Sequence, residues 1–286
     1  MGIRDPNDES SFYIRPMQRT EVDLAVDWAA AEGWNPGVCD AAPFLATDPG
    51  GFFVAVSDAR PIACISAVAY DETYGFIGFY IVHPEHRGRG YGIRIWRAAM
   101  DHMGARTIGL DGVLAQQRNY EKSGFRLAYR NVRYAGKVHG SRQEGAIPIA
   151  EADFAAILDY DSHCHAVPRE SFLRAWLAMP NAYGAALIEE GTLRGYGMIR
   201  SCRSGWKIGP LFADDAAGAQ RLLLTLAARA EGQEVFLDTP ETNAAAVALA
   251  ERHGMKPCFA TVRMYTQAAP RIALDKVFGV TTFELG

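Results

Sequence analysis

Apolar and aromatic residues in the first half of the chain form short runs separated by turn residues, and these runs predict strands. The strands are expected over residues 12–17, 52–56, 62–70, 76–82, 107–113 and 125–134. Apolar residues three or four positions apart predict three helices, one from an N-cap at Thr20 to Gly33 and two over residues 93–103 and 116–123. Strands and helices in this order predict a mixed α/β unit that ends near residue 138.

The second half of the chain repeats short segments of the first half. Two matching pairs are Leu110-Asp111 with Leu237-Asp238, and Val132-Arg133-Tyr134 with Val262-Arg263-Met264. A polar, glycine-bearing stretch over residues 137–145 separates the copies and is typical of a linker. We therefore predict duplicated domains over residues 1–138 and 146–270, each with a mixed, mostly antiparallel sheet flanked by helices. The apolar tail over residues 271–286 is expected to dock on the domains.

The composition of the 286-residue chain is that of a globular protein, with 49% apolar and 22% charged residues. A net charge of −4 gives no overall attraction to nucleic acid, and no apolar run reaches the roughly 18 residues of a membrane span. The polar N-terminal stretch lacks the apolar segment of a secretion signal, so a cytoplasmic protein is expected. The five cysteines form no Cys-x-x-Cys pair, which argues against disulfides and against a metal site.

A glycine-rich turn, Arg87-Gly88-Arg89-Gly90-Tyr91-Gly92, lies between a predicted strand and a predicted amphipathic helix. Glycines let the backbone approach a ligand and adopt positive φ, and the following helix directs its N-terminal partial charge at an anion. The two arginines add positive charge, so the turn predicts a pyrophosphate site. The matching segment of the second unit, residues 212–218, lacks arginines and carries two aspartates, so we expect one such site per chain.

The segment Val82-x-Pro84-Glu85-x-Arg87-Gly88-Arg89-Gly90-x-Gly92 resembles the coenzyme A motif of the GNAT N-acetyltransferase superfamily. The segment Asn119-Tyr120-Glu121-Lys122-Ser123-Gly124-Phe125 is similar to the second motif of that family. The resemblance covers residues 11–136, and residues 146–266 resemble a degenerate GNAT domain, as in tandem-GNAT proteins. It implies an α/β (α+β) fold of two tandem GNAT-like domains, of which the first is catalytic.

The resemblance also implies transfer of an acetyl group from acetyl-CoA to a primary amine, by direct attack within a ternary complex. The cofactor-binding residues that it implies are Ile81, Val82, Arg87, Gly88, Arg89, Gly90, Tyr91, Gly92, Asn119 and Tyr120. In this family a tyrosine at the position of Tyr120 protonates the leaving thiolate. An amine must be neutral to attack, so a base or a desolvating site is expected as well.

Many GNAT enzymes carry a glutamate base on the strand before the turn, but residues 75–82 include no carboxylate. Asp111, at the end of the next strand, is the base that we predict, and Glu72 and His83 are alternatives. The recurrence of Asp111 in the second unit also allows a structural role for it. The tail residue Glu284 could reach the acceptor site.

The acceptor is expected to be a small-molecule amine that contacts Trp34 and Asn35, in the loop after the first helix, and Tyr80, on an aromatic-rich strand. The second domain would shape this pocket or a homodimer interface. The missing strand glutamate leaves a second hypothesis open, a non-catalytic acyl-CoA-binding or regulatory protein. RNA binding through the arginine-bearing turn is a third hypothesis, which the acidic net charge disfavours.

Overall fold

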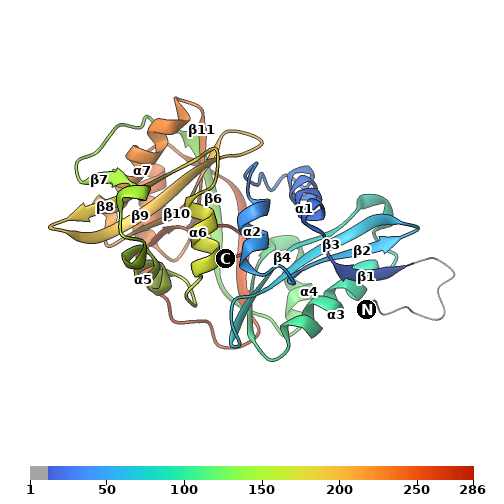
Figure 1. The fold of residues 1–286 in the computed structure, drawn as a ribbon. Helices are drawn as coiled ribbons and strands as arrows, with labels where there is room; N and C mark the ends of the chain where they lie inside the picture. The colour runs from blue at the N-terminus through green and yellow to red at the C-terminus, as the bar shows by residue number, and fades with distance from the viewer. Residues whose placement is uncertain (1–11) are drawn as a thin grey trace.

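The computed structural model describes residues 12–286, which form two α/β units joined by one continuous sheet (Figure 1). The strands of the first unit are β1 (Tyr13–Pro16), β2 (Phe52–Ser57), β3 (Arg60–Ala69), β4 (Tyr74–Val82) and β5 (Thr107–Val113). Its helices are α1 (Arg19–Ala31), α2 (Ala41–Thr47), α3 (Tyr91–Met103) and α4 (Gln117–Lys122). The strands of the second unit are β7 (Ala146–Pro148), β8 (Ala182–Glu189), β9 (Thr192–Ser201), β10 (Trp206–Ala213) and β11 (Glu234–Pro240). Its helices are α5 (Phe154–Cys164), α6 (Glu170–Leu177), α7 (Ala216–Ala227) and α8 (Ala244–Arg252). The remaining strands are β6 (Arg126–Lys137), β12 (Lys256–Tyr265) and β13 (Val277–Gly279).

The two central strands of the sheet are exchanged between the units. The order along the sheet is β1-β2-β3-β4-β5-β12-β6-β11-β10-β9-β8-β7, and β13 pairs with β10. β12, from the second half of the chain, pairs antiparallel with β5, and β6, from the first half, pairs antiparallel with β11. This mixed, mostly antiparallel sheet confirms the predicted fold class. The units expected at residues 1–138 and 146–270 are interlocked, because each lends a long strand to the sheet of the other.

The exchange gives a structural reason for the repeated aspartates and arginines. Asp111 on β5 lies opposite Arg263 on β12 and accepts hydrogen bonds from its Nε at 2.8 Å and its Nη2 at 2.5 Å. Asp238 on β11 lies opposite Arg133 on β6 and accepts from its Nε at 2.6 Å and its Nη2 at 2.7 Å. Each aspartate therefore pairs with the arginine of the other copy. Burial alone would raise the pKa of Asp238, but the Arg133 guanidinium outweighs it and holds that pKa below its ordinary value.

Helices α2 and α6 close the interface between the units on one face of the sheet. Phe44 on α2 stacks on Trp176 on α6 with ring centroids 6.0 Å apart, and both side chains are fully buried. Figure 1 shows the two helices next to each other, close to the C-terminal end of the chain. Because burial of large aromatic side chains is strongly stabilising, we infer that the two units pack as one body.

Two local details differ from the sequence-based predictions. The N-cap predicted at Thr20 is wrong, because α1 begins at Arg19 and the Glu21 carboxylate accepts a hydrogen bond from the Gln18 N–H at 2.7 Å. Helix α2 was not predicted, because it has only seven residues, among them Pro43, and is too short to show a helical period.

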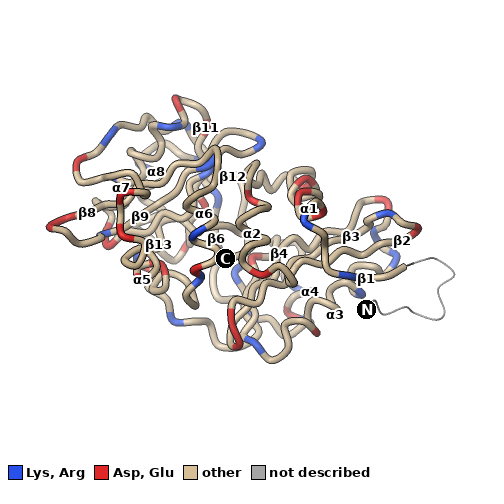
Figure 2. The backbone as a smooth tube through the Cα atoms, viewed as in Figure 1, with Lys and Arg blue, Asp and Glu red and all other residues tan. Residues whose placement is uncertain are grey.

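Acidic and basic side chains are interspersed along the backbone from residue 12 onward, and neither sign dominates either unit (Figure 2). None of the helices in this part of the chain is long and apolar enough to cross a membrane.

Candidate active site

Strands β4 and β5 run parallel at their beginnings and then separate. Their pairing ends at Ile77 and Leu110, although β4 continues to Val82 and β5 continues to Val113. On its other side β4 is bulged against β3 near Phe79, whose φ is +46°. The separation leaves the facing edge of β4 without a strand partner, and such an edge can pair with an extended ligand.

A cavity of about 420 Å³ opens at this separation. Its walls come from both halves of the chain: Glu32, Trp34, residues 77–82, Arg87, residues 110–113, Gln116, Tyr120, Phe259, Thr261, Phe283 and Glu284. The size is that of a pocket for a small ligand, and the mixture of aromatic walls with few charged groups is typical of such pockets.

The glycine-rich turn lies directly after β4 and leads into α3. Gly88 and Gly90 have φ values of +74° and +81°, and α3 begins at Tyr91. A β-carbon built on either glycine meets no atom within 4 Å, so both face open space. The turn therefore presents backbone and the N-terminus of a 13-residue helix to a ligand, as a phosphate site requires.

Arg87 is anchored within the protein. Its Nε donates to the Val82 carbonyl at 2.8 Å, and its Nη2 pairs with the Glu32 carboxylate at the end of α1. These contacts connect the turn to β4 and to the end of α1. The Glu32 carboxylate also neutralises part of the positive charge of Arg87. Arg89 is exposed at the rim, so the turn can bind an anion through its backbone and this second arginine.

Tyr120 on α4 lies against β5 at the inner end of the cavity. Its ring packs on Gly112, where a β-carbon would overlap it, and on Trp96, with centroids 5.8 Å apart. Burial raises the pKa of Tyr120 to about 12, so the phenol is protonated at neutral pH and can donate. Tyr80 on β4 lines the same cavity and also packs on Trp96, with centroids 5.3 Å apart.

Asp111 also lines the cavity, but its carboxylate is fully engaged. Its Oδ1 accepts from Asn131 Nδ2 at 2.8 Å, in addition to the two hydrogen bonds from Arg263. Burial raises the pKa of Asp111 above its ordinary value, and the Arg263 guanidinium opposes the rise. The hydrogen bonds favour the structural role that its recurrence in the second unit allowed, and the role of Asp111 as base stays a prediction.

The loop after α1 is held by the second unit. The Trp34 side chain lines the cavity, and its carbonyl accepts from Arg133 Nη1 at 2.6 Å. Lys207 Nζ donates to the Asn35 carbonyl at 2.6 Å. The Asn35 side chain exchanges hydrogen bonds with the Ser204 backbone at 2.9 and 3.0 Å and is absent from the cavity wall. These bonds hold the loop, and a contact of Asn35 with the acceptor stays a prediction.

Six predicted cofactor contacts lie outside the cavity wall: Gly88, Arg89, Gly90, Tyr91, Gly92 and Asn119. Asn119 is exposed and donates to Gln116 Oε1 at 2.7 Å. Tyr91 stacks on Phe12 with centroids 5.1 Å apart. Ile81 and Val82 do line the cavity. The contact of these residues with a cofactor stays a prediction.

Two profiles of the GNAT acetyltransferases match the chain. One is described as the acetyltransferase (GNAT) family and matches residues 17–125, and the other as an acetyltransferase (GNAT) domain and matches residues 157–279. The chain is a tandem GNAT protein. The resemblance stated from the sequence motifs is thereby confirmed, and the two matched domains correspond to the two units of the fold.

Several known proteins match this chain over nearly its whole length. The holothin acyltransferase of Pseudoalteromonas sp. (strain SANK 73390) is 29% identical over 98% of this chain and 96% of that protein. A putative acetyltransferase from Pyrococcus horikoshii has a TM-score of 0.83 at 22% identity and covers 99% of both chains. A tandem GNAT protein from the clavulanic acid biosynthesis pathway has a TM-score of 0.62 at 18% identity and covers 91% of this chain and 99% of that one. The relatives support an acyltransferase, and the solved structures show that the fold is that of a tandem GNAT.

In the second GNAT domain the corresponding gap is filled by the chain itself. The parallel pairing of β10 with β11 ends at Ile208 and Leu237. Beyond it β13 pairs antiparallel with β10, and the Val280 N–H donates to the Asp238 carbonyl of β11 at 2.8 Å. The edge that stays open in the first domain is thus occupied by the tail in the second domain.

The second half of the chain contributes cavity residues that the motifs do not reveal: Phe259, Thr261, Phe283 and Glu284. They reach the site through the exchanged strand β12 and through the tail. No local motif marks them. One indication of their position was visible in the sequence, a tail that is too apolar to be exposed to solvent and that contains Glu284.

Proposed function

We propose that this tandem GNAT protein is an acetyl-CoA-dependent N-acetyltransferase whose acceptor is the primary amine of a small molecule. One observation carries the proposal: the open edge of β4, Arg87 at the start of the glycine turn and Tyr120 all line one cavity. The residues fit the donor, because the turn leaves open space at Gly88 and Gly90 for a pyrophosphate. An extended pantetheine arm can then follow the unpaired edge of β4.

In this proposal the acceptor amine attacks the thioester directly while both substrates are bound. The C–N bond forms at the carbonyl carbon, and the C–S bond breaks as the tetrahedral intermediate collapses. Tyr120 donates its phenolic proton to the departing sulfur, and the nitrogen then returns a proton to the phenolate. A backbone N–H on the unpaired part of β4, beyond the bulge near Phe79, would stabilise the oxyanion.

A small acceptor is favoured because the cavity is enclosed by both units. The lining includes the aromatic residues Trp34, Tyr80, Phe259 and Phe283, and these suit a flat or apolar amine better than a flexible protein tail. The relative that is named holothin acyltransferase makes holothin the first acceptor to test. The second domain does not hold a second donor in this proposal, since β13 occupies its gap.

The experiment is steady-state release of free coenzyme A from acetyl-CoA with a panel of amines: holothin, benzylamine, aniline, lysine, spermidine and glucosamine. We expect turnover with the compact aromatic amines and little with spermidine, because the cavity walls are aromatic. Longer acyl-CoA donors with each amine define the acyl group. Saturable acetyl-CoA binding without turnover of any amine would favour the non-catalytic acyl-CoA-binding protein.

Replacing Tyr120 by phenylalanine is expected to lower kcat by up to about 100-fold and to leave acetyl-CoA affinity within about twofold. The effect falls at the low end for general acids because a thiol with a pKa of about 8.5 is already a fair leaving group. Stopped-flow turnover and titration calorimetry separate the two quantities. Turnover at the wild-type level would mean that water protonates the thiolate.

A further inference from the structure

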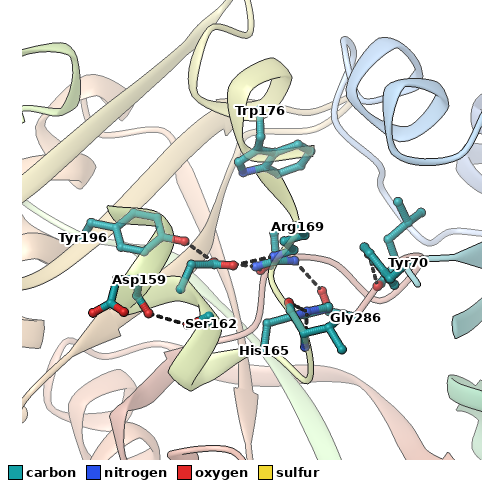
Figure 3. Close-up of polar contacts among 12 residues, drawn as sticks. Tyr70, Asp159, Ser162, His165, Arg169, Trp176, Tyr196 and Gly286 are labelled. Atoms are coloured by element: carbon teal, nitrogen blue, oxygen red, sulfur yellow. Dashed lines mark hydrogen bonds and ion pairs between the residues drawn. The ribbon is translucent and has the colours of Figure 1, made fainter. Parts of the chain in front are cut away.

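The tail crosses from the second domain into the first after it leaves β13. Arg169 Nη2 donates to Thr281 Oγ1 at 2.6 Å, and the Tyr70 hydroxyl donates to the Leu285 carbonyl at 2.7 Å. Figure 3 shows Arg169 directed at Gly286 and Tyr70 approaching from the first domain. Residues 277–286 are all buried. The tail is therefore a fixed part of the fold, and each side chain on it has a defined position.

Glu284 lies where the tail meets the bulged part of β4. A β-carbon on Gly78 would collide with the backbone carbonyl of Glu284, so the two backbones are in direct contact at this point. Glu284 is 3% exposed and lines the cavity. The tail thus places a carboxylate beside the strand that itself has none between residues 75 and 82.

Among the described residues, the cavity has three lining carboxylates, and their hydrogen bonds distinguish them. Asp111 accepts from Arg263 and Asn131, and Glu32 pairs with Arg87. Glu284 accepts no hydrogen bond from any residue between 12 and 286 and forms no ion pair with one. Glu284 lines the cavity, so a ligand can supply the hydrogen bonds that its carboxylate lacks, and in the proposed function the ligand that donates is an amine.

We propose that Glu284 is the general base of this acyltransferase and accepts a proton from the acceptor's nitrogen. The inference rests on the proposed function and adds the residue that the catalytic strand lacks. The acceptor enters as an ammonium ion, and Glu284 takes one of its protons through a hydrogen bond. The nitrogen lone pair then attacks the thioester carbon, and Tyr120 protonates the sulfur as the C–S bond breaks. The nitrogen passes its remaining excess proton to the Tyr120 phenolate, and the proton on Glu284 passes to solvent when the amide leaves.

The surroundings of Glu284 suit a base. Burial raises its pKa above the ordinary carboxyl value, while Lys207, Arg133 and Arg200 lower it and Asp40 raises it. Each of these cations also has an acceptor other than Glu284: the Asn35 carbonyl for Lys207, Asp238 for Arg133 and Asp40 for Arg200, although Arg200 Nη1 has no hydrogen-bond partner. A carboxylate with a raised pKa matches the pKa of an amine more closely, and proton transfer between the two becomes less unfavourable.

The test compares wild type with Glu284→Gln, which keeps the shape of the side chain and removes its charge, and with Glu241→Gln, a matched change at an exposed glutamate of the second domain. Acceptors are benzylamine, an ammonium ion at neutral pH, and aniline, which is already neutral. For benzylamine we expect kcat/KM to fall by about 100- to 10,000-fold in Glu284→Gln, the range for a general base. Acetyl-CoA affinity and Tm should stay at the wild-type values. For aniline the fall of kcat/KM in Glu284→Gln should be much smaller. In Glu241→Gln the kcat/KM for both amines should equal the wild-type value.

The pH profile is the second readout. A base works only when deprotonated, so wild-type kcat/KM with benzylamine should rise with pH through the raised pKa of Glu284 and then level off. In Glu284→Gln the rise should move up toward the pKa of the free amine. Glu284→Asp, whose carboxylate is one methylene further away, should retain part of the activity and the wild-type limb.

The outcomes separate the two proposals. Suppose that the wild type turns over both amines. Equal falls of kcat/KM for benzylamine and aniline in Glu284→Gln, or a pH profile that does not shift, would then overturn the role of Glu284 and leave the proposed acyltransferase activity intact. Absence of wild-type turnover with every amine of the panel would instead overturn the proposed function.

Discussion

Replacement of Arg263 by methionine is expected to lower the free energy of unfolding by about 3–5 kcal/mol. Methionine keeps the apolar volume of the arginine stem, but Asp111 is then left buried with Asn131 as its remaining hydrogen-bond donor. The side chains of Arg263 and Asp111 are 6% and 0% exposed, so water cannot replace the lost guanidinium. Urea unfolding followed by tryptophan fluorescence measures the change as a shift of the midpoint at constant slope.

The double variant Asp111→Leu/Arg263→Met is the control. It removes both charges and should recover most of the stability, because an apolar pair of similar volume often equals or exceeds a buried ion pair. We also expect one cooperative transition, since β6 and β12 belong to both units. Exposed ion pairs contribute up to about 1 kcal/mol to the free energy of unfolding. A loss smaller than this in Arg263→Met would contradict the burial of the Asp111–Arg263 pair.

The same ion pairs show what the sequence could and could not predict. The recurrence of Asp111 as Asp238, and of Arg133 as Arg263, was visible in the sequence and indicated duplication. That each aspartate pairs with the arginine of the other copy was not visible. Asp111 and Arg263 are 152 positions apart, and their contact depends on which strand lies beside β5. Local periodicity predicts strands, but it does not predict their neighbours in the sheet.

The donor side of the site was predictable, and much of the acceptor side was not. The turn at residues 87–92 is one continuous segment whose glycines and following helix determine its geometry locally. The acceptor walls combine a loop of the first unit with Phe259 on β12 and Phe283 in the tail. Such a site depends on tertiary contacts between distant segments. The ion pair of Asp111 was not predictable for the same reason, because its partner lies in the other half of the chain.

Duplication also explains the role that the tail acquired. A second domain with an open gap between β10 and β11 would expose unpaired strand edges, which are a liability for aggregation. β13 covers that edge, and the chain that continues from it reaches the first domain at Gly78. The tail thus fills the ligand gap of one domain and supplies residues to the site of the other. In the proposed function no phosphate binds at residues 212–218, so an acidic turn is tolerated there.

Replacement of Gly90 by glutamate is expected to weaken acetyl-CoA binding at least about 100-fold, or about 2.8 kcal/mol. The residue has a φ of +81° and caps α3, where an anion would lie against the helix N-terminus. A glutamate side chain would occupy the open space of the turn and bring a negative charge to the pyrophosphate. Titration calorimetry should show one acetyl-CoA per wild-type chain and little heat with the variant.

Gly104→Glu is the matched control for this change. Gly104 lies at the other end of α3, has a φ of +59° and also meets no atom within 4 Å of a built β-carbon. Both variants therefore carry a backbone strain of about 1–3 kcal/mol and the same added charge. Acetyl-CoA affinity within about threefold of wild type in Gly104→Glu, with near-complete loss in Gly90→Glu, assigns the effect to the turn itself, because a tenfold change in affinity corresponds to 1.4 kcal/mol. Equal affinities in the two variants would place the pyrophosphate elsewhere.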